Sequence, residues 1–545
     1  MEQRKIDEAW DQVAEHLVQD PDEDFNTYVD VCGKWANDRS KLAMILRNAD
    51  GTKEFWTYHQ LSMEVAKAST MFKEAGLKRG DRVAGMLSRQ IETWITALAA
   101  WKTGLVYVPL FVGFGSDAIS ERLEDSGSKA IVVGHQWRDT LGDAKQQLSN
   151  GISIFTVAGP RGIGLRQGDV SYWAELERCN PDFSIANTNR DTPATLMYTS
   201  GTTSTPKACI IPHSGFVALM PYTLSVFGVD KTDILFATSD PGWSYGLYTT
   251  GVTPMALGVT RIIYTGDFDP KAWVQLMKEE QATFISSAPS AYRRLLATAT
   301  RSGLPQSLRG ANSAGEPLDE ETANRWRELT GSPLRDGYGL TELGMVLGDL
   351  VKTDDDEPGA LSAPIPGFHV KLVNTEGHEV KNGPGQLAIQ KPRFQLSIGY
   401  DNVPETWDSR WEEGYYITDD LLERTENGGW RFLGRADDII VTSGYNVGPA
   451  EVEAVLLEDP GVDEAAVVAE PDPSRGQIVR AVLVKASDAT PESDLIKRLQ
   501  NAVRDRIGRH AYPRIVEFLD ELPRTATGKL RRASLKSIEA SKTAT

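Results

Sequence analysis

Cysteine and basic charge are both scarce in this chain. It has three cysteines, Cys32, Cys179 and Cys209, which lie far apart and form no CxxC pair. That spacing argues against a disulfide framework or a zinc knuckle and is typical of isolated buried thiols in a reducing compartment. Asp plus Glu (76) outnumber Lys plus Arg (58), which gives a net charge of −18 at pH 7. Because a nucleic-acid surface normally needs a basic surplus, we expect no nucleic acid partner.

The sequence also lacks a long apolar run. Residues 1–17 are charged throughout and show no signal-peptide pattern. The most apolar stretch, 94–114, contains Lys102, Gly104 and Pro109, so a buried helix followed by a buried strand explains it better than a membrane span. We therefore expect a cytoplasmic protein without a membrane span.

The first part of the chain alternates between strand and helix patterns. Hydrophobic residues make up 40% and charged residues 25% of 545 residues, which suits a globular protein of several domains. The alternation predicts an α/β fold with mainly parallel sheets covered by helices on both faces. The predicted helices are 90–102 and 117–125, and the predicted strands are 82–87, 105–108, 129–133, 195–198, 234–238, 261–264 and 283–286.

The end of the chain has a different pattern. It predicts helices at 449–457 and 491–507 and strands at 463–469 and 477–486, which together form a small α+β module. The segment 434–444 is the expected joint. We predict a large N-terminal domain, 1–436, which binds AMP and the acyl group, and a small mobile C-terminal domain, 437–545.

A stretch rich in Ser and Thr, YTSGTTSTPK at 198–207, follows an apolar strand. Its small residues would let backbone N–H groups approach an anion, its hydroxyls can donate to phosphate oxygens, and Lys207 adds charge. It does not match the P-loop pattern. Taken alone, the stretch fits a solvated loop as well as a phosphate cradle.

Further motifs follow in a fixed order along the chain. They are SAGEPL at 313–318, DGYGLTE at 336–342, YYITDD at 415–420, GRADDII at 434–440 and TGK at 527–529. With the 198–207 stretch, this set resembles the adenylate-forming superfamily of acyl-CoA synthetases, peptide-synthetase adenylation domains and luciferases. It is most similar to the short- and medium-chain acyl-CoA synthetases, over nearly the whole chain.

The resemblance implies an acid–thiol ligase. A carboxylic acid and ATP would give acyl-AMP and pyrophosphate, and CoA would then attack to give acyl-CoA and AMP. The implied cofactors are ATP and Mg²⁺, with CoA as co-substrate. The residues implied for ATP and AMP binding are Thr199, Ser200, Gly201, Thr202, Thr203, Lys207, Gly315, Glu316, Pro317, Asp336, Gly337, Tyr338, Gly339, Thr341, Asp420, Arg435 and Lys529.

Three residues are implied to act in catalysis. Thr341 would contact the α-phosphate, Glu342 would bind Mg²⁺, and Lys529 would reach both the carboxylate and the α-phosphate. Lys529 and Mg²⁺ would offset the repulsion between an attacking carboxylate and a phosphate. The context of Lys529, PRTATGK at 523–529, resembles one in which family members are acetylated, which would remove the charge and stop adenylation.

The resemblance also implies a hinge and a CoA site. The C-terminal domain would rotate about Asp437, so that the loop of Ser443, Gly444 and Tyr445 forms a tunnel for pantetheine. Arg504 and Arg514 are candidates for CoA binding in a locally basic C-terminal end, for which a solvated basic face is an equal alternative. The other arginines of this end are Arg506, Arg509, Arg524, Arg531 and Arg532.

Motif position identifies an acyl pocket. Acetate-specific relatives typically carry a Trp where this chain has Gly339, so Gly339 and Ala314 together open the pocket and predict a larger acid, whereas the Tyr245 ring would refill part of the space. We expect linear, branched or aromatic acids of about three to eight carbons, without strict selectivity. The pocket residues would be Trp243, Ser244, Tyr245, Ala314 and Gly339.

The chain departs from the family pattern at four positions. Ser204 and Ala208 replace glycines, Asp419 replaces the Gly of Thr-Gly-Asp, and Asn446 replaces an Arg. Asn446 removes a cation from the phosphate environment, which bears on the rate of adenylation, and Asp419 competes with Asp420 for the ribose role.

Three other functions fit parts of the sequence. GWSYG at 242–246 matches the GxSxG elbow of serine hydrolases, with Ser244 as nucleophile and His369, His378 or His510 as base. An adenylating enzyme could pass the acyl group to a carrier protein or another nucleophile, although no carrier domain is fused here. A silent binding module would not need Lys529 and Glu342. The protein would act as a monomer or a homodimer.

Overall fold

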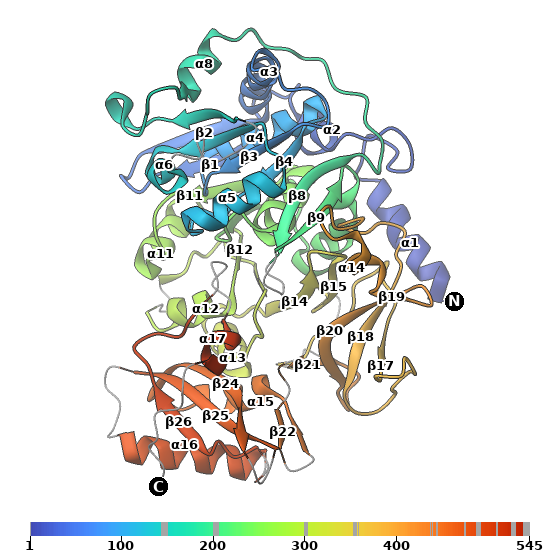
Figure 1. Cartoon of the computed structure of the whole chain (residues 1–545), viewed down its shortest axis with the longest axis vertical. Helices are drawn as coiled ribbons and strands as arrows, with labels where there is room; N and C mark the ends of the chain where they lie inside the picture. Colours follow the sequence, from blue (N-terminus) through green and yellow to red (C-terminus); the bar gives the residue numbers. More distant parts are fainter. Residues whose placement is uncertain are drawn as a thin grey trace.

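The structure is a computed structural model. It describes residues 2–142, 151–199, 206–298, 303–351, 357, 359–436, 438, 440–442, 445–472, 476–486, 492–507, 509, 511–524 and 530–537. Within them the chain forms four sheets, three in the large upper body of Figure 1 and one in the smaller part below it.

The first sheet carries the start of the nucleotide motifs. It has the strand order β7-β6-β5-β3-β4-β8-β9, parallel except for β9, which runs antiparallel to β8. Its strands are β3 (Arg82–Met86), β4 (Val106–Pro109), β5 (Ala130–Gly134), β6 (Ser153–Val157), β7 (Val170–Ser171), β8 (Pro193–Thr199) and β9 (Lys207–Pro212).

The second sheet is the longest among the described residues. Its order is β16-β15-β14-β13-β12-β10-β11-β1-β2, with parallel pairs from β14 to β1 and antiparallel pairs at both ends. Its strands are β1 (Leu42–Arg47), β2 (Lys53–Thr57), β10 (Ile234–Ala237), β11 (Thr260–Tyr264), β12 (Phe284–Ser287), β13 (Gly310–Ala314), β14 (Leu334–Leu340), β15 (Gly344–Gly348) and β16 (Ala363–Pro364).

Two further sheets complete the fold. The third is antiparallel and comprises β17 (Val370–Val373), β18 (Gly385–Gln390), β19 (Trp411–Glu412), β20 (Tyr415–Arg424) and β21 (Trp430–Arg435). The fourth lies in the C-terminal part and comprises β22 (Ile440–Thr442), β23 (Tyr445–Val447), β24 (Val462–Asp472), β25 (Gly476–Lys485) and β26 (Ile515–Phe518).

Helices cover these sheets. In the large body they are α1 (Glu2–Ala14), α2 (Thr27–Val31), α3 (Tyr58–Glu74), α4 (Ile91–Thr103), α5 (Ser116–Asp125), α6 (Arg138–Leu141), α8 (Tyr172–Arg178), α9 (Met220–Tyr222), α10 (Thr253–Ala256), α11 (Pro270–Glu279), α12 (Pro289–Leu296), α13 (Glu320–Thr330) and α14 (Pro404–Asp408). The C-terminal part has α15 (Pro449–Leu457), α16 (Glu492–Arg506) and α17 (Arg532–Ser537).

The predicted elements agree with this arrangement. The strand predicted at 82–87 is β3, the helix predicted at 449–457 is α15, and the apolar stretch at 94–114 is the buried helix α4 followed by β4. The α/β prediction is confirmed, with two mainly parallel sheets in the large body and an α+β C-terminal part. The antiparallel third sheet was not predicted, because its strands show no alternation with helices.

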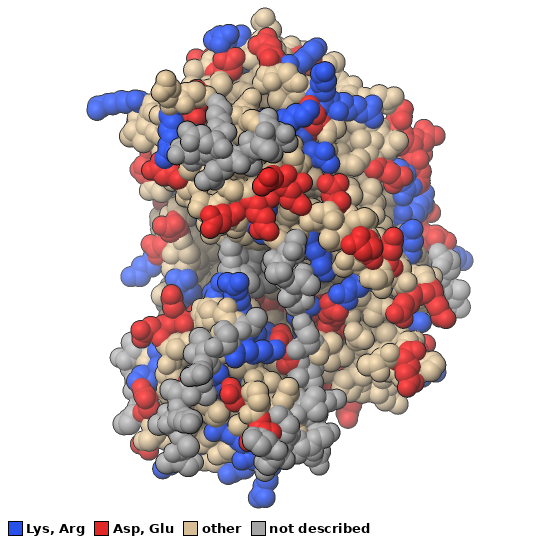
Figure 2. Space-filling model, viewed as in Figure 1, with Lys and Arg blue, Asp and Glu red and all other residues tan. Residues whose placement is uncertain are grey.

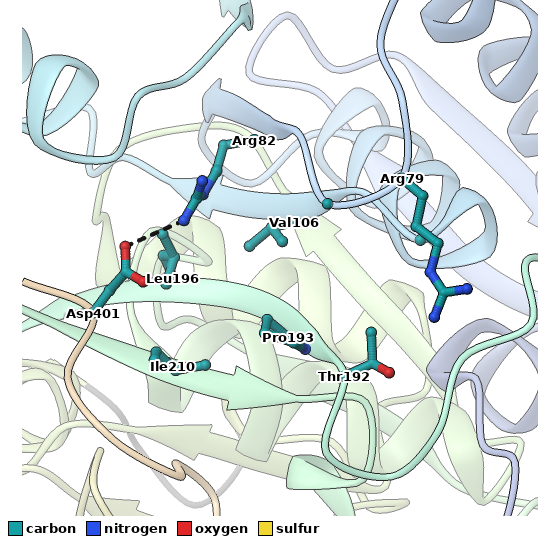
Figure 3. A pocket seen from close by; sticks show the side chains of 10 residues that line it. Arg79, Arg82, Val106, Thr192, Pro193, Leu196, Ile210 and Asp401 are labelled. Carbon is teal, nitrogen blue, oxygen red and sulfur yellow. Dashed lines mark hydrogen bonds and ion pairs between the residues drawn. The ribbon is translucent and has the colours of Figure 1, made fainter. Parts of the chain in front are cut away.

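A pocket of about 150 Å³ opens at the amino ends of β3, β4 and β8. Figure 3 shows an ion pair, Arg82 with Asp401, on one side of the pocket and Arg79 at the other end, with apolar side chains between them. The predicted nucleotide motifs lie at the opposite, carboxyl ends of the parallel strands. Among the described lining residues, none belongs to a predicted site, so the pocket is separate from the site below.

Candidate active site

The β8–β9 hairpin holds both ends of the Ser/Thr-rich stretch. Thr199 and Lys207 are direct partners in the antiparallel pair, so both ends of the stretch lie at the carboxyl end of β8. In open α/β sheets, ligands bind outside the carboxyl ends of the strands. Ser200, Gly201, Thr202 and Thr203 lie outside the described residues, so their phosphate contacts stay predictions.

Asn402 fixes the second end of this stretch. Its Nδ2 donates to the carbonyl of Pro206 at 2.9 Å, and its Oδ1 accepts from the N–H of Ala208 at 3.2 Å. The backbone beside Asn402 also pairs with β9, through hydrogen bonds between Ile210 and the segment 398–399. The sequence motifs do not include Asn402, and a lone Asn near a Pro gives no signal that could have identified it.

Strands β13 and β14 bring two further motifs together. They are parallel neighbours in which Ser313 lies opposite Asp336 and Ala314 lies opposite Gly337. The motifs 313–318 and 336–342 are therefore side by side at the carboxyl edge of the second sheet. Gly315 has φ +92°, a conformation that favours glycine, so the chain turns sharply there.

The Glu316 carboxylate contacts residues of helix α12. Its carboxylate accepts hydrogen bonds at 3.2 Å from the N–H and the hydroxyl of Ser290 at the start of α12, and it lies 3.9 Å from Arg293. Gly315 and Pro317 are exposed. The roles of Gly315, Glu316 and Pro317 in adenine binding stay predictions.

Asp336 is a half-buried acid between two polar neighbours. The Ser313 hydroxyl donates to Asp336 Oδ1, and the N–H of Asp336 donates to Asp349 Oδ2 at 2.7 Å. Burial, with the Asp349 charge as a further cause, raises the pKa of the Asp336 carboxyl to about 8. This environment favours a protonated Asp336 at neutral pH.

The two acids of the 415–420 motif have different partners. Asp419 is paired with Arg410, and Arg435 Nη2 lies 3.1 Å from Asp419 Oδ2. Asp420 instead accepts a hydrogen bond from the Tyr338 hydroxyl at 2.5 Å. Asp419 is therefore held by two cations, whereas Asp420 contacts a residue of the 336–342 motif.

Thr341 and Glu342 are held by one neighbouring segment. Ser397 donates its hydroxyl to the carbonyl of Thr341 at 2.7 Å and its N–H to the carbonyl of Glu342 at 2.9 Å. The Tyr400 hydroxyl donates to Glu342 Oε1 at 2.6 Å. Lys207 Nζ lies 5.4 Å from the centre of the Tyr400 ring, so a carboxylate and a cation from distant motifs flank one tyrosine.

Two aromatic residues of the predicted acyl pocket are fixed by their surroundings. The Tyr245 hydroxyl donates to Asn312 Oδ1 at 2.5 Å and lies 3.0 Å from the Ser286 hydroxyl, which places its hydroxyl at strands β12 and β13. The Trp243 ring packs against Phe111 and Phe114, with ring centres 5.3 Å and 5.5 Å away.

Gly339 lies at an irregular point of the β14–β15 pair. The register shifts between Tyr338 and Gly339, and an added Cβ at Gly339 would lie 2.4 Å from the carbonyl oxygen of Gly344 and 2.7 Å from Met345 Cα. Backbone packing therefore requires a glycine here, independently of the size of the acid. The absence of a side chain at Gly339 alone does not fix how large the acyl pocket is.

The surroundings of Ser244 do not form a hydrolase site. Ser244 lies several residues beyond the end of β10 and begins a π-helical segment (Tyr245–Val252) rather than a sharp strand-to-helix elbow. His369 lies beside Tyr415, and His378 lies beside Glu376. Neither contact brings a base to Ser244, and His510 lies outside the described residues.

Most of the residues predicted for the hinge, the pantetheine loop and catalysis in the C-terminal part lie outside the described residues. Lys529, Asp437, Ser443 and Gly444 lie outside the described residues, and only the backbone of Tyr445 and Asn446 is described, as part of β23.

The arginines of the C-terminal part are exposed or paired. Arg504 and Arg514 are exposed, and Arg504 Nε lies 2.8 Å from Asp505. Three more of the arginines proposed for a basic face form ion pairs with local acids, namely Arg506 with Glu458, Arg524 with Glu464 and Arg532 with Glu453. These pairs reduce the local positive field, and Figure 2 shows acidic and basic side chains interspersed over this side of the molecule.

Comparison with known proteins adds independent evidence. The family model described as "AMP-binding enzyme" matches residues 33–400, and its C-terminal domain model matches 451–529. The chain belongs to the AMP-binding enzyme family. This AMP-binding enzyme is 32% identical to the mouse mitochondrial acyl-coenzyme A synthetase ACSM3, over 94% of this chain and 90% of that one. It is 31% identical to the acetyl-coenzyme A synthetase of Bacillus subtilis, over 92% and 88%. A crystal structure of an acyl-CoA synthetase from Brucella canis matches with a TM-score of 0.75 and 32% identity, covering 97% of this chain and 98% of that one.

These matches confirm the predicted family. The assignment to the adenylate-forming superfamily, with its acyl-CoA synthetases as the most similar group, is correct. A similar solved structure, MatB from Rhodopseudomonas palustris, holds bound ATP; it is 25% identical with a TM-score of 0.82 and covers 94% of this chain and 98% of that one. Within the described residues, no helix of the AMP-binding enzyme is both long and apolar enough to cross a membrane.

Proposed function

We propose that this protein is an AMP-forming acyl-CoA synthetase. It joins a carboxylic acid to ATP as acyl-AMP with release of pyrophosphate, and it then transfers the acyl group to CoA with release of AMP. The reaction needs no side-chain nucleophile, because the acid and the thiol are themselves the attacking groups.

One observation carries this proposal. The cation of the phosphate stretch, Lys207, and the acid of the 336–342 motif, Glu342, lie on two sides of Tyr400 although they are far apart in sequence. A third motif lies beside them, because Asp420 accepts a hydrogen bond from Tyr338 of the 336–342 motif. A cation for phosphate, a carboxylate for a metal and a carboxylate for ribose hydroxyls are the groups that binding ATP for adenylation requires.

Mg²⁺ fits this donor set. The hard cation is held by one or two carboxylates together with phosphate oxygens and waters, and Glu342 supplies one carboxylate next to the phosphate stretch. When bound, Mg²⁺ would neutralise charge on the phosphates. Thr341 follows Leu340 at the end of β14, and we propose that its side chain contacts the α-phosphate.

The acid is proposed to be larger than acetate, at about three to eight carbons. Ala314 gives a small wall on β13, and it supports this size range. The Tyr245 ring lies against the same strands and limits the depth of the pocket. Because packing requires Gly339, the size proposal rests on Ala314 more than on Gly339.

The C-terminal part is proposed to supply the second half of the cycle. Lys529 would act in adenylation, and rotation of residues 437–545 about Asp437 would then bring Ser443, Gly444 and Tyr445 to the CoA thiol. Arg514 is a candidate for CoA phosphate, since it is exposed and Arg504 has Asp505 as a close partner. Acetylation of Lys529 would switch off the first half-reaction.

The proposal is tested by ATP–pyrophosphate exchange over a panel of acids from acetate to octanoate and benzoate. We expect acid-dependent exchange with Mg²⁺ present, and thioester formation when CoA is added. The Ser244→Ala variant should keep this activity. Exchange that is fastest with acetate by a wide margin would refute the proposed size range. Absence of exchange with every acid would refute adenylation.

A second candidate shares only the first half-reaction. An enzyme that passes the acyl group to a carrier protein or an amine would show acid-dependent exchange but would form no thioester with CoA. Trapping with a phosphopantetheinylated carrier protein would then distinguish it from the CoA ligase.

A further inference from the structure

A short segment, residues 397–402, connects the two halves of the proposed phosphate site. We refer to it as the strap. Its first residue, Ser397, holds the backbone of Thr341 and Glu342, and its last residue, Asn402, holds the backbone of Pro206 and Ala208. The strap therefore fixes the 336–342 motif relative to the phosphate stretch.

Tyr400 stands in the middle of the strap and is itself rigidly held. Its side chain is 3% exposed, and its ring packs edge-on against Trp407 with a centre-to-centre distance of 5.4 Å. Its backbone forms an antiparallel bridge with Cys209 of β9. A tyrosine fixed in this way has little freedom to move its hydroxyl away from Glu342.

The adjacent Asp401 anchors the strap to the first sheet. Its carboxylate lies 3.3 Å from Arg82 at the start of β3, as Figure 3 shows, and its N–H donates to the carbonyl of Ala208 at 2.8 Å. The strap is thus attached to both β3 and β9, which keeps Tyr400 at a constant position relative to Lys207.

The hydrogen bond to Glu342 has a specific geometry. Of the two Glu342 oxygens, the Tyr400 hydroxyl contacts Oε1, and it also lies 3.4 Å from the Tyr416 hydroxyl. No donor reaches Oε2 from the part of the chain that the structure describes. A hydrogen bond to one oxygen of a carboxylate fixes its rotation and directs the other oxygen, which is how groups outside a metal's own ligands orient those ligands.

We infer that Tyr400 is a positioning residue, which orients the Glu342 carboxylate for the metal ion that accompanies ATP. The inference rests on the proposed function, because it takes Glu342 as a metal ligand. Tyr400 acts through Glu342 and not by contact with the acid or the reacting phosphate.

The test is the Tyr400→Phe variant, which removes the hydroxyl but keeps the ring and its contact with Trp407, so we expect it to fold. The matched control is Tyr248→Phe, which also loses a buried tyrosine hydroxyl bond, here to Thr195 at 2.8 Å, on a different part of the fold. Thermal unfolding of both variants would measure what each hydroxyl contributes to stability alone.

Metal binding is measured without turnover. Mn²⁺ is titrated in the presence of α,β-methylene-ATP, which cannot be cleaved at the reacting bond, and free Mn²⁺ is followed by electron paramagnetic resonance. We expect Tyr400→Phe to weaken Mn²⁺ binding about 10- to 100-fold, the usual effect of losing such a supporting hydrogen bond. Tyr248→Phe should bind Mn²⁺ as the wild type does.

Glu342→Gln separates the inference from the proposed function. Wild-type Mn²⁺ binding by Tyr400→Phe, together with weakened binding by Glu342→Gln, would overturn the role of Tyr400 and leave the proposed function standing. Unchanged Mn²⁺ binding by Glu342→Gln would remove Glu342 from the metal site and overturn the role of Tyr400, whereas the proposed function would still be decided by acid-dependent ATP–pyrophosphate exchange.

Discussion

At the scale of single residues, tertiary neighbours decide what each acid of the site can do. Asp419 and Asp420 are adjacent in sequence and chemically identical, yet Arg410 and Arg435 hold the first and Tyr338 the second. The side chains that other parts of the chain bring to each carboxylate account for the difference.

The pKa of Asp336 leads to a prediction about stability. Because burial raises it from 3.8 to about 8, the folded protein binds a proton that the unfolded chain releases between these values. The resulting stabilisation is fully present below pH 3.8 and is lost as the pH rises through about 8. We expect Asp336→Asn to remove this pH dependence, since its amide oxygen can still accept from Ser313.

Urea midpoints of the wild type and Asp336→Asn at several pH values between 5 and 9 would measure the effect. Asp230→Asn is the control, because Asp230 is exposed to solvent and its pKa is lowered by Thr232 rather than raised by burial. Parallel midpoint curves for the wild type and Asp336→Asn would contradict the prediction.

At the scale of elements, the irregular pairing of β14 with β15 gives a packing reason for Gly339, a glycine that the sequence pattern attributes to acid size. An added Cβ at Gly339 would approach backbone atoms of Gly344 and Met345, which cannot move as a flexible side chain can. The packing of β14 on β15 is therefore enough to explain a glycine at this position.

We predict that Gly339→Ala destabilises the protein by about 1–3 kcal/mol, the usual cost of overpacking. Gly399→Ala is the control, because its added Cβ would approach only Ile210 Cδ1, at 3.9 Å. Denaturant unfolding of both variants measures the difference. A Gly339→Ala variant of normal stability with altered acid preference would show that pocket size, not packing, keeps the glycine.

At the scale of the whole molecule, the C-terminal part has a hydrophobic core of its own. The fourth sheet and its helices form their own core, including Val452, Leu483 and Leu499. Helix α17 contacts two other segments. Its Lys536 forms an ion pair at 2.9 Å with Asp438, and its Arg532 forms another with Glu453 of α15. A small body with its own core can move as a unit.

This arrangement predicts separable half-reactions. Lys529→Ala should slow acyl-AMP formation about 10²–10³-fold, the effect of losing one charge that stabilises a transition state. Thioester formation from supplied acyl-AMP and CoA should stay near the wild-type rate. Lys497→Ala, which removes a charge from the exposed side of α16, is the control and should change neither rate.

Rapid-quench measurement of the two half-reactions separates these outcomes. Equal loss in both half-reactions would assign Lys529 to substrate binding that the two steps share, and would contradict its specific role in adenylation.

The sequence by itself determined the elements, the fold class and the family. Alternating apolar runs and helical patterns are local, so strands such as β3 and helices such as α4 and α15 could be located from the residues themselves. The ordered motifs identified the superfamily because their spacing along the chain is itself information.

Only the tertiary structure decided how those motifs meet. The strap residues Ser397, Tyr400 and Asn402 belong to no predicted motif, and their partners lie about sixty to two hundred positions away. The turn of Glu316 toward Ser290 and the packing at Gly339 likewise depend on neighbours from other elements. Contacts between distant segments leave no local pattern in a single sequence, because they depend on how the whole chain folds.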